Sequence, residues 1–230
     1  ETNLFCVEGI KSVLEIPTDY EIKYFILSES YAKKHSTIEF SRAPVHVADE
    51  KTFAKASGAV TPQGVIAVCR KKEASIKDFA NGIVLVLCET QDPGNVGTLV
   101  RVADAAGCTG VILTKGCADV YGKKAVSAAA ASVFRVPLVT NVDADMTILT
   151  LKKNFLICGT SIRGENLPYS IDFTKNCVII IGNEGAGLSQ KIESFCDKLI
   201  KIPMPGHADS LNAAVAGGII VFETVRQRIM

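Results

Sequence analysis

Three glycine-bearing loops hold most of the residues in this sequence that could take part in chemistry. They are DPGNVG at 92–97, GNEGAG at 182–187 and PMPGHADSLN at 203–212. Glycine carries no side chain, so loops of this kind let backbone N–H and C=O groups approach a ligand closely. Each loop follows a strand-like apolar stretch and precedes a helical one. We therefore expect the three loops to meet and to build one site.

The first loop is typical of a helix start, with an arginine further along the helix. Pro93-Gly94 predicts a turn, and Asn95 is the predicted N-cap residue. Arg101 follows six residues later. An arginine within a helix commonly extends to solvent or pairs with a carboxylate such as Asp104. Spacing alone therefore leaves open whether Arg101 has a function.

The second loop places one carboxylate, Glu184, among three glycines. Two interpretations stay open: Glu184 caps free backbone N–H groups, or it handles a charged or hydroxyl-bearing ligand. No Lys-Ser/Thr follows the last glycine, so the loop is not a phosphate-binding P-loop. The first loop offers GNVG where a dinucleotide-binding site needs GxGxxG. The sequence thus argues against NAD and against the common nucleotide-fold methyltransferases.

The third loop leads into a helix that is rich in small residues. Ser210 is the predicted N-cap of this helix. Within Ala213–Gly218, two glycines stand side by side, and glycine inside a helix costs about 1 kcal/mol relative to alanine. Such a cost predicts tight packing. The close neighbour is either the protein core, another backbone segment, or a second copy across a dimer axis.

Apolar runs between these loops predict the strands that position them. Because the runs are continuous, the strands are expected to be buried on both faces, as in a parallel sheet covered by helices. Loops gather at the carboxyl ends of such strands, where ligands bind. The expected site is therefore a cofactor-sized pocket made mostly of backbone groups. The predicted strands are 83–88, 110–114, 136–140, 155–160, 177–181 and 199–203, and the predicted helices are 95–106, 122–132, 143–153, 188–195 and 210–227.

The chain divides into two α/β regions. Short strand-like and helix-like stretches alternate over residues 4–70 and predict a small domain at 1–70. A weakly patterned segment at 71–81 is the expected linker, and 82–230 forms the larger domain. The sequence begins at Glu1, at the edge of a strand-like FCVE, which suggests that upstream residues have been removed.

Composition gives weaker constraints. The 25 basic and 24 acidic residues leave a net charge of +1, which argues against a strong nonspecific nucleic-acid binder. Eight cysteines stand singly, without metal-ligand spacing, and are expected to be reduced, buried thiols of a cytosolic-type protein. The apolar runs are far shorter than the roughly 18–20 residues of a membrane span, and no signal peptide is visible.

At the three loops the sequence resembles the SpoU/TrmH family of RNA ribose 2'-O-methyltransferases, within the SPOUT superfamily. Three motifs match in order and spacing: N-x-G-x-x-x-R at 95–101, G-N-E-G-x-G-L at 182–188, and I-P-M-x-G…S-L-N at 202–212. The resemblance covers residues 82–230. It extends weakly to FCVEGI (5–10) and TPQGVIAV (61–68), which are similar to the family's L30e-like substrate-binding module.

The resemblance implies an α/β fold in which a parallel sheet carries a deep trefoil knot, a rare exception to the rule against knots. A small L30e-like domain would precede it. The family resemblance also implies an obligate homodimer, in which the first loop of one subunit completes the site of the other. The chemistry that it implies requires no metal, and the expected location, from the reduced cysteines, is the cytoplasm.

The cofactor implied by the resemblance is S-adenosylmethionine. Family motifs assign its binding to Thr160, Gly182, Asn183, Gly185, Ile202, Met204 and Leu211.

The resemblance gives the catalytic step to Arg101, which would help to remove the proton of a ribose 2'-hydroxyl. A free guanidinium has a pKa above about 12. The milder alternative is therefore that Arg101 only orients a phosphate and polarises the hydroxyl. Asn95 would hold the first loop, while Glu184, Ser210 and Asn212 would position Arg101 and the ribose.

One segment departs from the family pattern. The family's K-x-x-R-A-S-x-G-x-x-F is KKAVSAAAASVFR at 123–135 here, with Ser127 at the usual Arg, Ala129 at the Ser and Ala131 at the Gly. This segment bears on the substrate and on activity. An inactive SPOUT-like RNA-binding protein acting in ribosome assembly is thus the main alternative to the enzyme. The expected substrate is structured RNA, ribosomal rather than transfer RNA because the N-terminal module is similar to that of rRNA-directed members.

Overall fold

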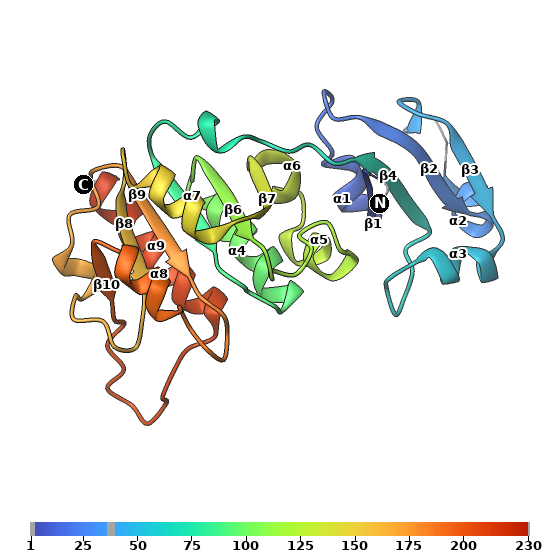
Figure 1. Ribbon diagram of the computed structural model, residues 1–230. Coiled ribbons are helices and arrows are strands. Elements are labelled where there is room, and N and C mark those ends of the chain that lie inside the picture. Colours follow the sequence, from blue (N-terminus) through green and yellow to red (C-terminus); the bar gives the residue numbers. More distant parts are fainter. Residues whose placement is uncertain (1–2, 36–39, 230) are drawn as a thin grey trace.

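The computed structural model describes residues 3–35 and 40–229, which form two β-sheets covered by helices. The sheets lie at opposite ends of an elongated molecule, and the segment that joins them runs along its upper side in Figure 1.

The N-terminal sheet has four strands in the order β1-β4-β2-β3. Strands β1 and β2 pair antiparallel with β4, whereas β2 and β3 are parallel. The predicted alternation of strands and short helices in this region is confirmed. Its elements are β1 (Leu4–Glu8), α1 (Ile10–Leu14), β2 (Ile22–Ser28), α2 (Glu29–Lys34), β3 (Val45–Ala48), α3 (Glu50–Ala56) and β4 (Val65–Arg70).

The C-terminal sheet has six strands in the order β10-β8-β9-β5-β6-β7, and its paired strands all run parallel. Leu85 and Leu87 face one apolar core, while Val84 and Val86 on the same strand face another. Both faces are therefore buried, as the continuous apolar runs predict. The strands are β5 (Ile83–Leu87), β6 (Gly110–Thr114), β7 (Leu138–Val142), β8 (Leu156–Thr160), β9 (Cys177–Ile181) and β10 (Lys198–Ile200).

Helices cover this sheet on both sides. Residues of α4, α5, α6 and α9 share one core with the sheet, and residues of α7 and α8 share the other. These helices are α4 (Pro93–Ala105), α5 (Lys123–Ala129), α6 (Ser132–Arg135), α7 (Ala144–Leu151), α8 (Gln190–Phe195) and α9 (Ala213–Ile229). Two short 3₁₀ helices, η2 (Ile76–Asp78) and η3 (Pro168–Ser170), lie in connecting segments.

Some predicted boundaries are wrong, for local reasons. The predicted helix 122–132 divides into α5 and α6 around Ala130, whose φ of 52° does not continue a right-handed helix. Strand β10 ends at Ile200 rather than at residue 203. Pro203 and Pro205 lack the N–H group that a strand needs. Residues 201–212 therefore form an extended loop, which projects at the lower left of Figure 1.

A shared aromatic cluster joins the two sheets. Phe5 of β1 lies against Tyr121, with ring centroids 4.9 Å apart, and Tyr20 meets Phe134 of α6 at 4.7 Å. The segment 71–81 follows the edge strand β7, because the N–H of Ala74 donates to the carbonyl of Leu138. The joining segment is thus held along the larger sheet.

The end of α9 is anchored to the segment between β8 and β9. Arg228 donates to the carbonyls of Phe173 and Lys175, and Gln227 bonds the backbone of Phe173. At Gly164 in the same segment, a Cβ would lie 2.7 Å from the carbonyl oxygen of Leu199. The segment therefore lies alongside β10 backbone to backbone, and Asn166 forms a parallel bridge with Ile200. The trefoil knot expected in this region stays a prediction.

All eight cysteines are free thiols, and five of them are buried. Burial raises the pKa of Cys88 to about 12, which keeps its thiol protonated and unreactive. Over residues 3–35 and 40–229, no helix is long and apolar enough to cross a membrane.

Candidate active site

The site lies where two neighbouring strands send their helices to opposite faces of the sheet. Strands β5 and β9 pair side by side, while α4 and α8, which follow them, join different cores. In sheets of this kind, ligands bind at the carboxyl edge near such a change of side. A pocket of about 430 Å³ lies at this edge, within the size range of small-molecule sites, and its lining comes from the segments that follow β8, β9 and β10 rather than from the loop after β5.

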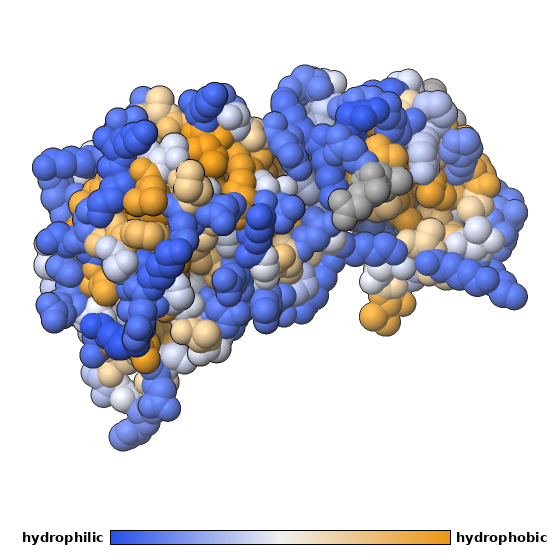
Figure 2. Space-filling view, viewed as in Figure 1, coloured by the Kyte–Doolittle hydropathy of each residue, from blue (hydrophilic) through white to orange (hydrophobic). Residues whose placement is uncertain are grey.

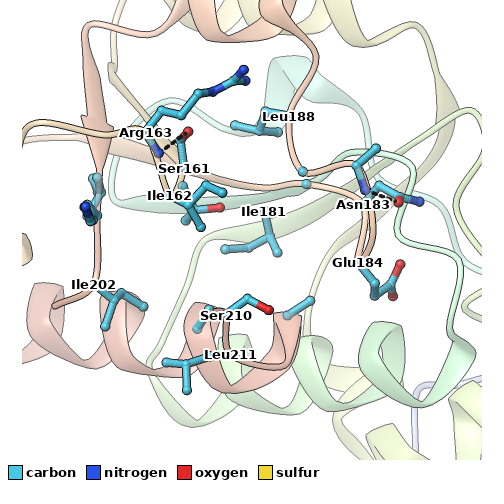
Figure 3. Close-up of a pocket in the computed structure, with 18 of the residues that line it drawn as sticks. Ser161, Ile162, Arg163, Ile181, Asn183, Glu184, Leu188, Ile202, Ser210 and Leu211 are labelled. Carbon is cyan, nitrogen blue, oxygen red and sulfur yellow. Dashed lines mark hydrogen bonds between the residues drawn. The ribbon is translucent and has the colours of Figure 1, made fainter. Parts of the chain in front are cut away.

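The pocket lining can be compared directly with the predicted residues. Of the predicted catalytic residues, Glu184 and Ser210 line the pocket, whereas Asn95, Arg101 and Asn212 do not. Figure 3 shows Ser210 and Leu211 on the wall opposite Ser161, Arg163 and Leu188. The residues predicted to hold the cofactor all contribute to the lining: Thr160, Gly182, Asn183, Gly185, Ile202, Met204 and Leu211.

Asn183 fixes the shape of the second loop. Its side-chain oxygen accepts hydrogen bonds from the N–H groups of Gly185 and Ala186, and its Nδ2 donates to the carbonyl of Glu89. Backbone hydrogen bonds in both directions join Asn183 to Gly187, which has a φ of 68°. The glycines that face the pocket therefore belong to a rigid turn, and their backbone is presented in one conformation.

Glu184 ties the second loop to the first. Its carboxylate accepts hydrogen bonds from the N–H of Gln91 at 3.0 Å, the N–H of Asp92 at 3.1 Å and the side chain of Asn95 at 2.9 Å. Of the two open interpretations, the geometry favours the cap on free N–H groups. Burial alone would raise the pKa of Glu184, but the hydrogen bonds from Asn95 and Gln91 outweigh it and hold that pKa below its usual value.

Asn95 also bonds a residue of the third loop. Its side-chain oxygen accepts a hydrogen bond of 2.8 Å from Nδ2 of Asn212. The Oδ1 of Asn212 accepts in turn from the N–H groups of Ala214 and Val215. A chain of side-chain hydrogen bonds, Glu184–Asn95–Asn212, therefore joins the three loops.

Two predicted N-caps are wrong. Asp92, not Asn95, caps α4, because Pro93 occupies the first helical position and the Asp92 carboxylate accepts from the N–H of Asn95. Helix α9 begins at Ala213, and Asn212 rather than Ser210 bonds its first N–H groups. Ser210 lies two residues before the cap, in the wall of the pocket.

Arg101 lies on the exposed side of α4. The alternative pairing with Asp104 is not formed, because that carboxylate binds Arg135 at 2.8 Å and the hydroxyl of Ser132 at 2.7 Å. Arg101 is thus free to meet a ligand that approaches α4 from outside the pocket.

The unusual segment 123–135 packs against α4 and does not line the pocket of its own chain. A Cβ on Gly97 would lie 2.1 Å from the carbonyl oxygen of Ala125 and 2.8 Å from the Cβ of Ala128. The two helices therefore touch backbone to backbone, and small residues on α5 permit this approach.

Sequence reasoning missed a polar cluster at the pocket. Ser161 and Arg163 follow β8, and both bond the carboxylate of Glu193 on α8. The available signal was a serine and an arginine directly after a predicted strand. In the described part of the chain, no group of three or more His, Cys, Asp or Glu side chains is placed to hold a metal ion.

The hydrogen bonds of Glu184 to the first loop predict that Glu184→Gln changes thermal stability in a pH-dependent way. The variant is expected to lower Tm at pH 7 by about 2–4 °C, since a surface-screened hydrogen-bonded carboxylate contributes about 1 kcal/mol. Because its folded pKa is lowered, this contribution is complete above the ordinary glutamate pKa of about 4.3 and is lost as pH falls through the folded pKa. Tm measured from pH 7 to 3 should therefore show the two proteins converging. A constant difference across this range would contradict the role.

Two family models match this chain, one in each of its two regions. Residues 82–222 match the SpoU rRNA methylase family, and residues 1–67 match the MRM3-like substrate binding domain. The 23S rRNA (guanosine(2553)-2'-O)-methyltransferase RlmP of Bacillus subtilis is 32% identical over 96% of this chain and 88% of its own length. The 23S rRNA (uridine(2479)-2'-O)-methyltransferase of Streptomyces viridochromogenes is 38% identical over 60% of this chain, and the match spans 50% of that protein.

Solved structures of the same group share the fold. The SpoU methyltransferase AviRb of Streptomyces viridochromogenes, in complex with the cofactor AdoMet, matches with a TM-score of 0.88 at 27% identity, over 99% of this chain and 91% of that one. The AdoMet-bound rRNA methyltransferase of Sinorhizobium meliloti matches with a TM-score of 0.84 at 30% identity, over 97% and 87%. The predicted α/β fold with a parallel sheet is confirmed. The chain belongs to the SpoU rRNA methylase family.

Proposed function

We propose that this protein transfers the methyl group of S-adenosylmethionine to a ribose 2'-hydroxyl of structured ribosomal RNA. The observation that carries the proposal is the pocket at the carboxyl edge of the sheet: the second and third family loops line it, and the first loop is hydrogen-bonded to both of them. Their connection by Glu184, Asn95 and Asn212 supports a site that is built before any ligand arrives. Ribosomal rather than transfer RNA is favoured because several relatives are named for 23S rRNA.

The pocket suits S-adenosylmethionine in size and chemistry. Side chains of Ile181, Leu188, Ile202 and Leu211 offer apolar walls for an adenine ring, and the glycine turn offers backbone groups for polar contacts. When bound, the cofactor supplies an electrophilic methyl group. The residues proposed to hold it are Thr160, Gly182, Asn183, Gly185, Ile202, Met204 and Leu211.

The proposed catalytic group is Arg101. Its exposed guanidinium can donate hydrogen bonds to an RNA phosphate and to the 2'-hydroxyl, which orients the hydroxyl and increases its acidity. Asn95, Glu184 and Asn212 hold the loops in place through the hydrogen bonds described above. Ser210, in the pocket wall, is proposed to position the ribose.

We propose further that two copies pair through α9. An exposed apolar stripe runs along this helix at Val215, Ile219 and Phe222, whose side chains remain 51%, 42% and 47% exposed. A Cβ on Gly218 would meet only Val102 of α4, at 3.9 Å, so this glycine leaves room for a neighbour. Arg101 directly precedes Val102 and therefore flanks the stripe. Pairing through α9 would place it beside the partner's pocket, which it does not reach in its own chain.

The dimer proposal predicts that Ile219→Asp yields a folded monomer with little methyl transfer. A carboxylate in the centre of the stripe would be buried without a partner on pairing. Mass measured by sedimentation should fall from two chains to one, while CD spectra stay unchanged. Met146→Asp is the matched control, because Met146 is 67% exposed on α7 and outside the stripe. A dimeric Ile219→Asp variant would refute pairing through α9.

RNA recognition is proposed to depend on shape and on few charged contacts. Polar and charged residues cover most of the face in Figure 2, with smaller apolar areas between them, and the net charge is only +1. We propose that residues 1–70 bind the RNA substrate, that 71–81 connect the domains, and that 82–230 catalyse the transfer. The proposed enzyme acts in the cytoplasm and uses no metal.

The function is tested by supplying purified protein with labelled S-adenosylmethionine and either ribosomal or transfer RNA. Methyl incorporation into ribosomal RNA, mapped to one ribose, is the expected result. Calorimetry with S-adenosylhomocysteine provides the second measurement. Cofactor binding without transfer to any RNA would favour the inactive RNA-binding alternative. Absence of both binding and transfer would overturn the enzyme.

A further inference from the structure

A cluster of charged side chains at the pocket has no role in the function proposed so far. The carboxylate of Glu193 accepts a hydrogen bond of 2.7 Å from Ser161 and one of 2.9 Å from Nη2 of Arg163. The backbone N–H of Arg163 also donates to the hydroxyl of Ser161. All three residues line the pocket. They form one connected unit at the carboxyl ends of β8 and β9.

The guanidinium of Arg163 is bonded to Glu193 through Nη2, and the rest of it is accessible. Its side chain is 58% exposed, whereas that of its partner Glu193 is 13% exposed. Across residues 3–35 and 40–229, Nε and Nη1 of Arg163 have no hydrogen-bond partner. Figure 3 places Arg163 on the same side of the pocket as Ser161 and Leu188. The guanidinium thus presents free donors beside the cavity.

Because of the charges around the pocket, an anionic group of a ligand needs a cation beside it in order to bind there. Three carboxylates line it, those of Glu184, Glu193 and Asp209, against two cations, Arg163 and Lys201. A carboxylate entering this site would be repelled unless a cation pairs with it. The planar guanidinium binds carboxylates with two parallel hydrogen bonds, and here Glu193 already holds it in position. Lys201 is exposed and has a flexible side chain, so it is less pre-organised than Arg163 to bind a carboxylate.

We propose that Arg163, positioned by Glu193, binds the α-carboxylate of the methionyl group of S-adenosylmethionine. The inference rests on the proposed function, because it assigns one end of that same cofactor. It gives the site a means to distinguish the whole cofactor from adenosine compounds that lack the amino acid. Glu193 acts as a positioning residue, since it reaches the ligand only through Arg163.

The experiment compares three ligands by calorimetry with the full chain. S-adenosylhomocysteine carries both the ammonium and the carboxylate of the amino acid. Decarboxylated S-adenosylmethionine keeps the ammonium but lacks the carboxylate, and 5'-methylthioadenosine lacks both. Arg163→Gln is expected to weaken S-adenosylhomocysteine binding by about 10- to 100-fold, the range for a lost charge-assisted pair. The Kd values of the other two ligands should change less than about threefold. Glu193→Gln should give the same pattern with a smaller loss.

Arg70→Gln is the matched control, because Arg70 forms a similar ion pair with Glu21 at 2.8 Å in the N-terminal sheet. It should leave all three Kd values unchanged. Arg163→Lys, which keeps the charge and loses the fork, should fall between wild type and Arg163→Gln, and Tm values should confirm that each variant is folded.

Equal losses for S-adenosylhomocysteine and 5'-methylthioadenosine would overturn the inference, and so would a loss seen with Lys201→Gln but not with Arg163→Gln. If wild-type protein binds none of the three ligands, the proposed function fails instead.

Discussion

Arg101→Ala is expected to abolish methyl transfer while the affinity for S-adenosylmethionine stays within a few-fold. The two effects separate because Arg101 is exposed on α4 and does not line the pocket. Its guanidinium therefore can act on the RNA without contributing to the cofactor site of its own chain. A group that assists proton removal typically contributes 10²- to 10⁴-fold to the rate. Single-turnover rates with ribosomal RNA, together with calorimetry, measure both quantities.

Thr98→Ala provides the control for this experiment. Thr98 is exposed on α4, three residues before Arg101 and thus on the same side of the helix. Its substitution should leave the rate and the cofactor affinity unchanged. Full turnover by Arg101→Ala would exclude a catalytic role for the arginine. A large loss of cofactor affinity would instead assign it to the binding site.

Gly182→Ala is expected to destroy the cofactor site and to lower stability. A Cβ at this position would lie 2.4 Å from the carbonyl carbon of Gly187 and 2.7 Å from the nitrogen of Leu188. Both are backbone atoms, so the turn can accept the methyl group only by opening. Overpacking of this kind costs about 1–3 kcal/mol, which corresponds to a fall in Tm of several degrees for a chain of this size. Binding of S-adenosylhomocysteine should be lost together with the turn.

Gly206→Ala separates this steric effect from a general intolerance of alanine. A Cβ on Gly206 would have no atom within 4 Å, and the residue lies in the third loop. The Tm of the Gly206→Ala variant in thermal unfolding should therefore equal that of the wild type. A Gly182→Ala protein with wild-type Tm and affinity would show that the turn is flexible, which contradicts the rigid loop described above.

The sequence by itself determined the order of elements and the location of the pocket. Apolar runs such as 83–88 and 177–181 predict buried strands because burial on both faces excludes polar residues from every position. The glycine loops that follow these strands then meet at one edge of the sheet. These local patterns alone predict a pocket lined mostly by backbone groups, whereas the family motifs were needed to name Gly182, Ile202 and Leu211 in its wall.

Only the tertiary structure decided what the polar side chains bind. Local sequence predicts that Asn95 caps its helix, yet its side-chain partners Glu184 and Asn212 lie 89 and 117 residues away in the chain. The ion pair of Arg163 with Glu193 likewise joins residues from different elements. A side chain that can cap a local N–H group can equally bond a distant one, and the choice depends on which segments pack together. Hydrogen-bond capacity is therefore visible in sequence, whereas the partner is fixed by the fold.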